Sequence, residues 1–212
     1  MQDITHQVNE VSERIHALRA EMPRVLVAIC GAPGSGKSTL AGEVARRLRQ
    51  QKCPCVTVPM DGFHLDNPIL EERDLLRRKG SPESFDADGF LRLVALLTER
   101  VDVVAPRFDR SRDAAIAGAI HVPPDCPVVL VEGNYLMFDE EPWRQLADLW
   151  DLSVRIDAPM PDLRARLIQR WLSQNYSRTV ATQRAEMNDI PNASRVQIRA
   201  LPCDIMFDGT RE

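Results

Sequence analysis

A glycine-rich segment carries the residues whose types and spacing most clearly indicate chemistry. Residues 31–38 match the pattern G-x-x-x-x-G-K-[ST] in full. In such a loop, glycines let main-chain N–H groups reach phosphate oxygens, and the positive end of the following helix favours the anion. We expect the Lys37 ammonium to contact the β- and γ-phosphates and the Ser38 hydroxyl to bind Mg²⁺. The predicted nucleotide-binding residues are Gly31, Ala32, Pro33, Gly34, Ser35, Gly36, Lys37, Ser38 and Thr39.

Two acidic residues follow predicted strands and could serve phosphoryl transfer. Glu132 ends the apolar run 128–131, and Asp61 comes shortly after the run 56–58. In α/β folds, ligands gather at the carboxyl ends of the strands. Glu132 could therefore hold Mg²⁺ or orient a metal-bound water, unless it is an ordinary acid at a strand end. Asp61 could take the proton of an acceptor hydroxyl; the alternative is a turn former beside Gly62.

An alternation of strands and helices must position these residues. The pattern predicts strands at 24–30, 56–58, 101–105, 128–132 and 152–157, and helices at 37–51, 86–100, 143–149 and 161–174. This order is typical of a parallel sheet with helices on both faces. We therefore predict an α/β protein with the P-loop NTPase fold and a five-stranded parallel sheet. The stretch 61–86 has little periodicity and is expected to be an irregular loop, functional or mobile.

The first residues of the chain predict an amphipathic helix over residues 3–20. Its apolar positions recur at alternating spacings of four and three, and they are Ile4, Val8, Val11, Ile15 and Leu18. Two heptads favour a helix packed on the domain over a dimerisation helix, which leaves a homodimer open. We divide the chain into this helix, residues 1–23, and a single domain, residues 24–212.

Composition narrows the classes of partner. The chain has 212 residues, of which 44% are hydrophobic and 27% charged, with a net charge of −4. This balance predicts one globular domain and gives no indication of nucleic acid or membrane as a partner. The longest apolar run, Val25–Cys30, is far shorter than a membrane span of about 20 residues, and residues 1–10 do not resemble a signal peptide, so we expect a cytoplasmic protein. The five cysteines are expected to be free thiols.

Four separated motifs resemble those of the uridine kinase, phosphoribulokinase and bacterial type I pantothenate kinase group of P-loop kinases. Besides the phosphate loop, residues 61–63 are similar to the Asp-Gly-Phe segment of pantothenate kinases. Residues 78–86 are close to their Arg-Lys-Gly-Phe-Pro-Glu-Ser-Tyr-Asp stretch, and residues 131–133 resemble the group's Walker-B-like strand end. The likeness spans roughly residues 24–207. Residues 131–136 most resemble a bacterial subgroup described as fructose-transport-associated kinases.

The resemblance implies an enzyme that uses ATP and Mg²⁺ to phosphorylate a hydroxyl group of a small metabolite. It implies that Asp61 is the catalytic base and that the Asp86 carboxylate accepts hydrogen bonds from substrate hydroxyls. For Asp86, a helix N-cap is an equal alternative.

Residues 162–170 look like the start of the lid in the same kinases, and we expect a mobile helical lid at about 161–190. Arg166 and Arg170 lie four positions apart and so on one helix face. There, two guanidinium groups could offset the charge that builds up during transfer. The alternative is a solvated basic face.

The chain departs from pantothenate kinases at residues 106–110, which read Pro-Arg-Phe-Asp-Arg in place of Pro-x-Tyr-Ser-His. The added charges argue against pantothenate and favour a compact polyhydroxylated acceptor, a sugar such as fructose. The predicted acceptor contacts are His64, Asp86, Arg107, Asp109, Arg110 and Asn192. For His64, an exposed loop position is the alternative.

Other activities stay open from the sequence. A nucleoside or pantothenate kinase is one, and a P-loop switch or ATPase that hydrolyses nucleotide for a protein partner is another. The chain contains no Asn-Lys-x-Asp motif for guanine, which argues against a GTPase switch.

Overall fold

The structure is a computed structural model that describes residues 3–209. Its strands are β1 (Val25–Gly31), β2 (Cys55–Pro59), β3 (Val103–Asp109), β4 (Ala114–Val122), β5 (Val128–Gly133), β6 (Leu152–Asp157) and β7 (Ile205–Asp208). Its α-helices are α1 (Thr5–Arg19), α2 (Lys37–Gln50), α3 (Asn67–Glu72), α4 (Ala87–Thr98), α5 (Met160–Leu172), α6 (Arg178–Arg184) and α7 (Ile190–Ile198). Shorter 3₁₀ segments are η1 (Met60–Phe63), η2 (Leu76–Arg78), η3 (Pro82–Ser84) and η4 (Trp143–Leu149), and η5 (Ala185–Asp189) is a π-helix.

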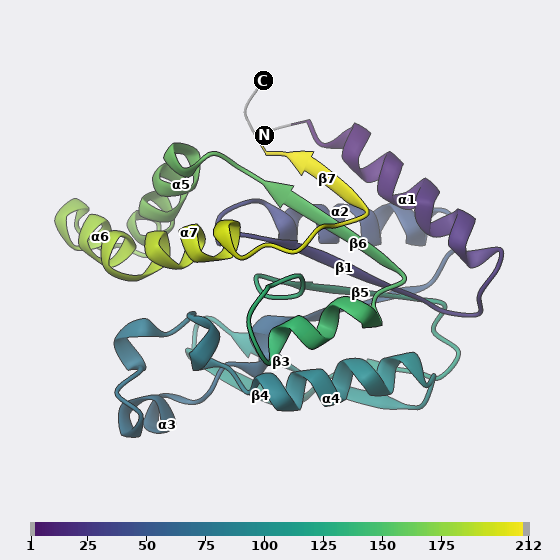
Figure 1. Cartoon of the computed structure of the whole chain (residues 1–212), viewed down its shortest axis with the longest axis horizontal. Coiled ribbons are helices and arrows are strands. Elements are labelled where there is room, and N and C mark those ends of the chain that lie inside the picture. The colour runs from purple at the N-terminus through teal and green to yellow at the C-terminus, as the bar shows by residue number, and fades with distance from the viewer. Residues whose placement is uncertain (1–2, 210–212) are drawn as a thin grey trace.

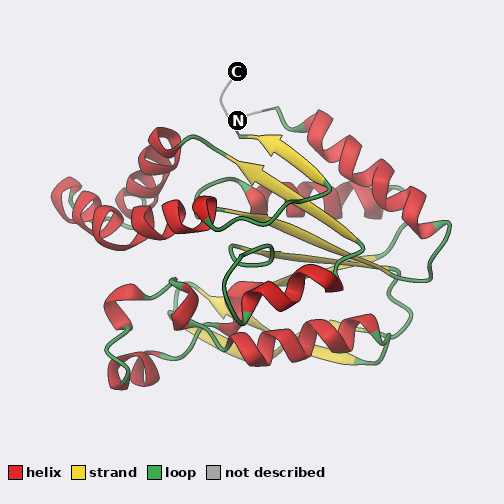
Figure 2. Ribbon diagram, in the orientation of Figure 1, coloured by secondary structure: helices red, strands yellow, loops and turns green. Residues whose placement is uncertain are grey.

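The main sheet is parallel and has the strand order β2-β5-β1-β6-β7 (Figure 1). Alternate residues of β1 point to opposite faces. Val25, Val27 and Ile29 pack in one apolar core with α1 and α2, whereas Leu26 and Ala28 pack in a second core with α4, α5 and α7. Helices therefore cover both faces (Figure 2), and the predicted α/β P-loop fold with five parallel strands is confirmed.

One predicted member of the parallel sheet is wrong. The strand expected at 101–105 corresponds to β3, which pairs antiparallel with β4 in a separate two-stranded sheet. Several side chains of this hairpin are exposed, as is common for an antiparallel pair with one solvated face. The fifth parallel strand is instead β7, an edge strand of four residues. Such a short strand, with Met206 exposed, leaves almost no apolar pattern in the sequence.

The stretch 61–86 is more ordered than expected. It contains two complete 3₁₀ turns, the end of η1 and helix α3, whose first main-chain N–H is capped by the Asp66 carboxylate. These pieces are too short for apolar periodicity to indicate them. An isolated bridge between His64 and Phe85 closes the stretch into one unit.

Helix α1 packs on the domain through fully buried side chains, among them Val11 and Ile15. The region predicted as a helical lid contains most of α5, α6 and η5, and Figure 1 shows α5, α6 and α7 grouped at one end of the molecule. Among residues 3–209, no helix is both long and apolar enough to cross a membrane.

Candidate nucleotide and acceptor site

The phosphate loop runs from the end of β1 to the start of α2. A Cβ atom at Gly31 would lie 2.5 Å from the carbonyl oxygen of Ile156 in β6, so this position requires glycine. Gly36 has φ 105° and a Cβ there would meet no atom within 4 Å, so that side of the loop is open. Helix α2 begins directly after it and directs its positive end at the loop. This arrangement suits a bound polyphosphate.

Strand register brings the predicted catalytic groups to one edge of the sheet. Glu132 of β5 is paired with Ile29 of β1 on one side and with Pro59 of β2 on the other. The segments that follow β1 and β2 carry Lys37 and Asp61, so both residues flank the end of β5. Neighbouring strand ends therefore supply all three side chains.

Ser38 and Glu132 form a direct contact beside the phosphate loop. The Ser38 hydroxyl donates a hydrogen bond to Glu132 Oε2 at 3.0 Å. Burial raises the pKa of Glu132, while the Lys37 ammonium and the Ser38 hydrogen bond act to lower it. A half-buried carboxylate in this condition gains from a nearby cation.

The oxygens of Ser38 and Glu132 fit Mg²⁺, which binds few protein oxygens and takes others from phosphates. Among residues 3–209, no group of three or more His, Cys, Asp or Glu side chains is placed so that it could hold a metal ion. The Lys37 ammonium makes no hydrogen bond within the same part of the chain, which leaves it available to an incoming anion.

Asp61 is covered by the β3–β4 hairpin. Arg110, just after β3, donates a hydrogen bond from Nη2 to Asp61 Oδ2 at 3.0 Å. The hairpin packs so closely on η1 that a Cβ atom at Gly62 would lie 2.5 Å from the Pro106 carbonyl oxygen, so this position requires glycine. No local sequence pattern indicates this ion pair, because its partners are 49 positions apart and meet only through the hairpin.

His64 is enclosed by aromatic rings rather than exposed. Its ring centroid lies 4.0 Å from that of Phe85 and 4.7 Å from that of Phe108. Burial lowers the pKa of His64, and the charge of Asp61 offsets part of that effect. Nδ1 lies 2.8 Å from the main-chain oxygen of Asp61, so a neutral ring donates there and keeps Nε2 as an acceptor.

Asp86 is the N-cap of α4, where its Oδ1 accepts a hydrogen bond from the Gly89 N–H at 2.9 Å. The N-cap alternative is therefore realised. The Asp86 side chain also borders a cavity of 340 Å³ whose lining includes Glu83, Glu140 and Arg195 but neither Asp61 nor His64. The structure thus places Asp86 beside a cavity that Asp61 and His64 do not line.

The three charged residues predicted as acceptor contacts in this hairpin differ in what they contact. Asp109 holds the turn between β3 and β4, because its Oδ1 accepts hydrogen bonds from the main-chain N–H and the hydroxyl of Ser111. Arg107 is exposed on β3. Of the three charged residues expected from this segment, Arg110 is the one that contacts Asp61.

The two lid arginines have different partners. Arg166 donates to the carbonyl oxygens of Gly34 at 3.2 Å and Ser35 at 3.4 Å, so it touches the phosphate loop directly. Arg170 instead donates to Asp189 Oδ1 at 3.2 Å, within the lid. Although their spacing puts both residues on one helix face, the two guanidinium groups contact different parts of the protein.

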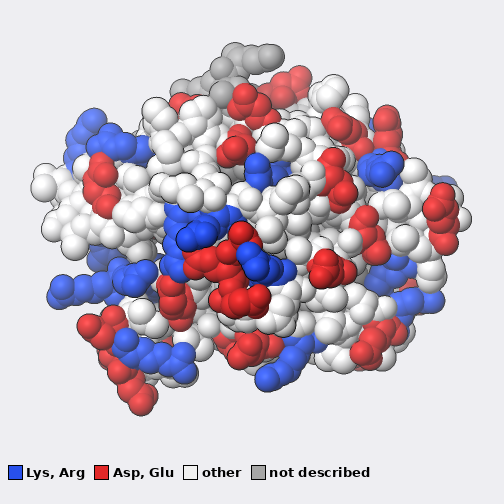
Figure 3. All heavy atoms as spheres, in the orientation of Figure 1, with Lys and Arg blue, Asp and Glu red and all other residues white. Residues whose placement is uncertain are grey.

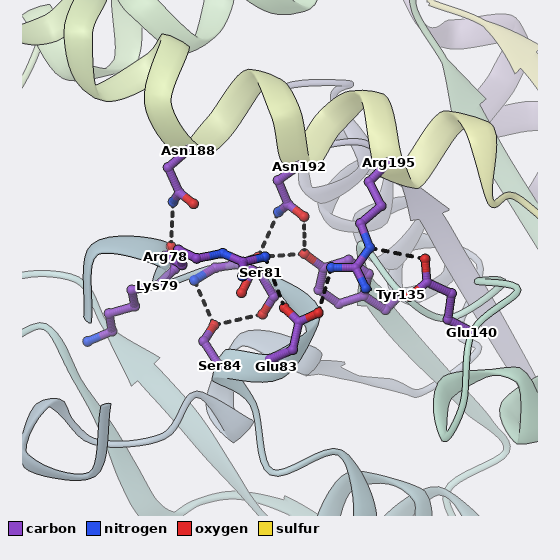
Figure 4. A network of polar contacts seen from close by, with 11 residues as sticks. Arg78, Lys79, Ser81, Glu83, Ser84, Tyr135, Glu140, Asn188, Asn192 and Arg195 are labelled. Atoms are coloured by element: carbon purple, nitrogen blue, oxygen red, sulfur yellow. Dashed lines mark hydrogen bonds and ion pairs between the residues drawn. The ribbon is translucent and has the colours of Figure 1, made fainter. Parts of the chain in front are cut away.

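Asn192 lies in α7 and is buried. Its Nδ2 donates to the Gly80 carbonyl oxygen at 2.7 Å, and its Oδ1 accepts a hydrogen bond from the Tyr135 hydroxyl at 2.7 Å (Figure 4). Both ends of the amide are thus occupied by the protein. A direct acceptor contact would require Asn192 to exchange one of these bonds.

The face shown in Figure 3 carries charged side chains of both signs. Acidic and basic side chains are interspersed over the face shown in Figure 3, without a broad patch of one sign. This agrees with the net charge of −4.

Comparisons with known proteins agree with this geometry. Residues 26–178 match the model of the "Phosphoribulokinase / Uridine kinase family". A crystal structure from Silicibacter sp. TM1040, named a "putative fructose transport system kinase", is 48% identical with a TM-score of 0.86 over 92% of this chain and 98% of that one. The "Uncharacterized protein YggC" of Escherichia coli is 37% identical over 96% of this chain and 90% of its own length. A "Putative uridine kinase C227.14" of Schizosaccharomyces pombe is 32% identical over 96% and 91% of the two chains.

The family model spans well over half of the sequence, and these relatives align over nearly its whole length. The phosphate loop, the Glu132 strand end and the lid helices lie where a phosphoryl-transfer enzyme needs them. The chain therefore belongs to the phosphoribulokinase / uridine kinase family and is an ATP-dependent kinase of small molecules.

Proposed function

We propose that the protein transfers the γ-phosphoryl group of ATP to a hydroxyl of a small sugar, with fructose as the first candidate. One observation carries the proposal: Lys37, the Ser38–Glu132 pair and the Asp61–Arg110 pair are placed at adjoining strand ends. A phosphate contact, oxygen ligands for a cation and a carboxylate for the acceptor are thereby available together.

On the nucleotide side, the main-chain N–H groups of the loop and Lys37 hold the phosphates. Ser38 and Glu132 would hold Mg²⁺, which when bound neutralises phosphate charge. Arg166 reaches the loop from the lid and adds positive charge there. Arg170, from the next turn of α5, would supply a second guanidinium once it exchanges Asp189 for phosphate.

On the acceptor side, Asp61 orients the attacking hydroxyl and takes its proton. Arg110 holds the Asp61 carboxylate in place from the hairpin, and Nε2 of His64 offers an acceptor for a second hydroxyl. Arg107, exposed on β3, is a further candidate for a sugar contact. Several polar groups of this kind are costly to leave unpaired, which favours a polyhydroxylated ligand over an apolar one.

The name of the Silicibacter relative, which is 48% identical, supports a sugar. The test is a coupled assay of ADP release with saturating Mg-ATP and one acceptor at a time, covering fructose and other free sugars, pantothenate and uridine. We expect release that depends on a sugar. A preference for pantothenate or uridine over every sugar would contradict the sugar assignment, and hydrolysis that no acceptor stimulates would contradict transfer itself.

A further inference from the structure

Two adjacent residues of the π-helix η5 face different parts of the protein. Asn188 donates from Nδ2 to the main-chain oxygen of Lys79 at 2.8 Å (Figure 4). Asp189 is buried and accepts hydrogen bonds from Arg170 at 3.2 Å and from the Trp171 indole N–H at 2.5 Å. The same backbone turn therefore contacts α5, which carries the lid arginines, and the segment 78–85. Single π-helical turns of this type frequently occur at functional sites.

Asn192, one turn further along, reinforces the contact with segment 78–85. The Gly80 carbonyl oxygen accepts from Asn192 Nδ2 at 2.7 Å and lies 2.5 Å from the Tyr135 hydroxyl. Gly80 has φ 97°, a conformation that favours glycine, and its N–H donates to the Ser84 hydroxyl at 2.8 Å. Two buried side chains, Asn192 of α7 and Tyr135 just after β5, hold the Gly80 carbonyl oxygen from outside the turn. Removing one such bond leaves a buried polar group unpaired.

Segment 78–85 continues from this anchor to the acceptor side of the site. Ser84 accepts the Gly80 N–H through its hydroxyl and the Leu65 N–H through its main-chain oxygen. Phe85 then packs its ring on His64. The path from Asn192 to His64 consists of hydrogen bonds and one ring contact.

A second path runs through Lys79. Its ammonium donates to Asn67 at 2.7 Å and to the main-chain oxygen of Asp113 in the hairpin turn at 2.9 Å. The same ammonium lies 5.2 Å from the ring centroid of Phe108, whose ring also contacts His64. Because Asn188 bonds to the main chain of Lys79, and the Lys79 ammonium bonds to the hairpin turn, Asn188 also helps to position the hairpin that covers Asp61.

We propose that Asn188 and Asn192 are positioning residues that couple nucleotide binding at the lid to the placement of the acceptor side. The proposal rests on the proposed function, since it takes Arg170 as a phosphate contact. If a bound nucleotide attracts Arg170, the Asp189 contact changes, and the adjacent Asn188 transmits that change to segment 78–85. The coupling is reciprocal, so acceptor binding also favours nucleotide binding.

The first test needs no acceptor. Hydrogen–deuterium exchange of the full chain is measured with and without Mg²⁺ and the β,γ-imido analogue of ATP. In the wild type we expect the analogue to slow amide exchange in segment 78–85. In Asn188→Ala and Asn192→Ala we expect analogue affinity within about twofold of wild type, but loss of that slowing. Equal slowing in wild type and both variants, or none in the wild type, overturns the proposal.

Matched controls separate coupling from general loosening. Gln197, also in α7, donates to Asp157 and Ala158 and does not touch segment 78–85. Gln197→Ala should therefore keep the slowing. Asn188 is only partly buried, so its variant remains informative if the buried Asn192→Ala unfolds. Loss of slowing in Gln197→Ala as well would show a structural effect and contradict the proposal.

Kinetics give the second test. For Asn188→Ala we expect the KM for the acceptor at saturating ATP to rise about tenfold, while the Kd of the ATP analogue measured without acceptor changes less than about twofold. Asn192→Asp, which puts an oxygen opposite the Gly80 carbonyl, should raise the acceptor KM further. An equal loss in acceptor KM and in analogue affinity measured without acceptor overturns the coupling, whereas a wild type that phosphorylates no acceptor contradicts the proposed function and leaves the exchange test valid.

Discussion

Arg110 binds Asp61 through a single hydrogen bond of 3.0 Å, and it does so from a hairpin outside the main sheet. The carboxylate proposed as the base is thus held by an exposed side chain that directly follows strand β3. Acceptor chemistry and hairpin position are linked by this contact. The link is open to mutation because Arg110 is largely exposed.

Arg110→Ala is expected to lower kcat/KM for the acceptor about tenfold, since the Asp61 carboxylate loses its orienting partner. ATP affinity, measured by calorimetry, should stay within about twofold. Arg112→Ala is the matched control, because Arg112 belongs to the same turn and pairs with Asp109. Equal effects of the two variants would indicate loss of general positive charge.

Asp61→Asn keeps the size of the side chain and removes the base. We expect turnover to fall by roughly 10² or more while ATP affinity is nearly intact, as steady-state assays and calorimetry can check. Asp66→Asn serves as control, because Asp66 caps α3 and asparagine caps equally well. Near-normal turnover in Asp61→Asn would mean that another group takes the proton.

Much of the nucleotide side could be predicted from the sequence because its signals are local. The loop at 31–38 is a contiguous motif, and Glu132 ends a run of apolar residues that has to be a buried strand. Both depend only on neighbours in the chain. Parallel pairing then fixes which strand ends meet.

The acceptor side could not be predicted in the same way, because its contacts join distant segments. The Asp61–Arg110 pair spans 49 positions and the Asn192–Gly80 bond spans 112. Asp109 illustrates the difficulty: its carboxylate serves the hairpin turn, a use that any Asp near a turn can have. Residue type alone does not distinguish a ligand contact from a structural one.

The Glu132 carboxylate is expected to lower the stability of the fold while it serves to bind Mg²⁺. Burial raises the pKa of this carboxyl above its ordinary value of 4.5, so the folded state keeps the proton at pH values where the unfolded chain has lost it. The ionised carboxylate therefore lowers stability above its folded pKa. That cost disappears as the pH falls through the raised pKa.

Glu132→Gln, neutral at every pH, is therefore expected to melt roughly 2–4 °C above wild type in metal-free neutral buffer. The difference should shrink as the pH falls through the raised pKa towards the ordinary value of 4.5, because the wild-type carboxyl then becomes neutral too. Mg²⁺-dependent turnover should fall in the same variant. Calorimetric melting at several pH values checks the first part, and a variant that melts below wild type at neutral pH would contradict it.

The lid arginines give a prediction in which the two variants differ. Arg166 bonds to carbonyl oxygens of the phosphate loop, so Arg166→Ala should disturb the loop and weaken ATP binding as well as slow transfer. Arg170 bonds to Asp189 instead, so Arg170→Ala should lower kcat by about tenfold to a hundredfold with ATP affinity little changed, since its phosphate contact forms as charge develops. Arg164→Ala is the control, because Arg164 pairs with Glu186 on the exposed side of α5. Single-turnover rates and calorimetry separate the two effects, and unaltered kinetics in Arg170→Ala would leave Arg170 as a structural partner of Asp189 alone.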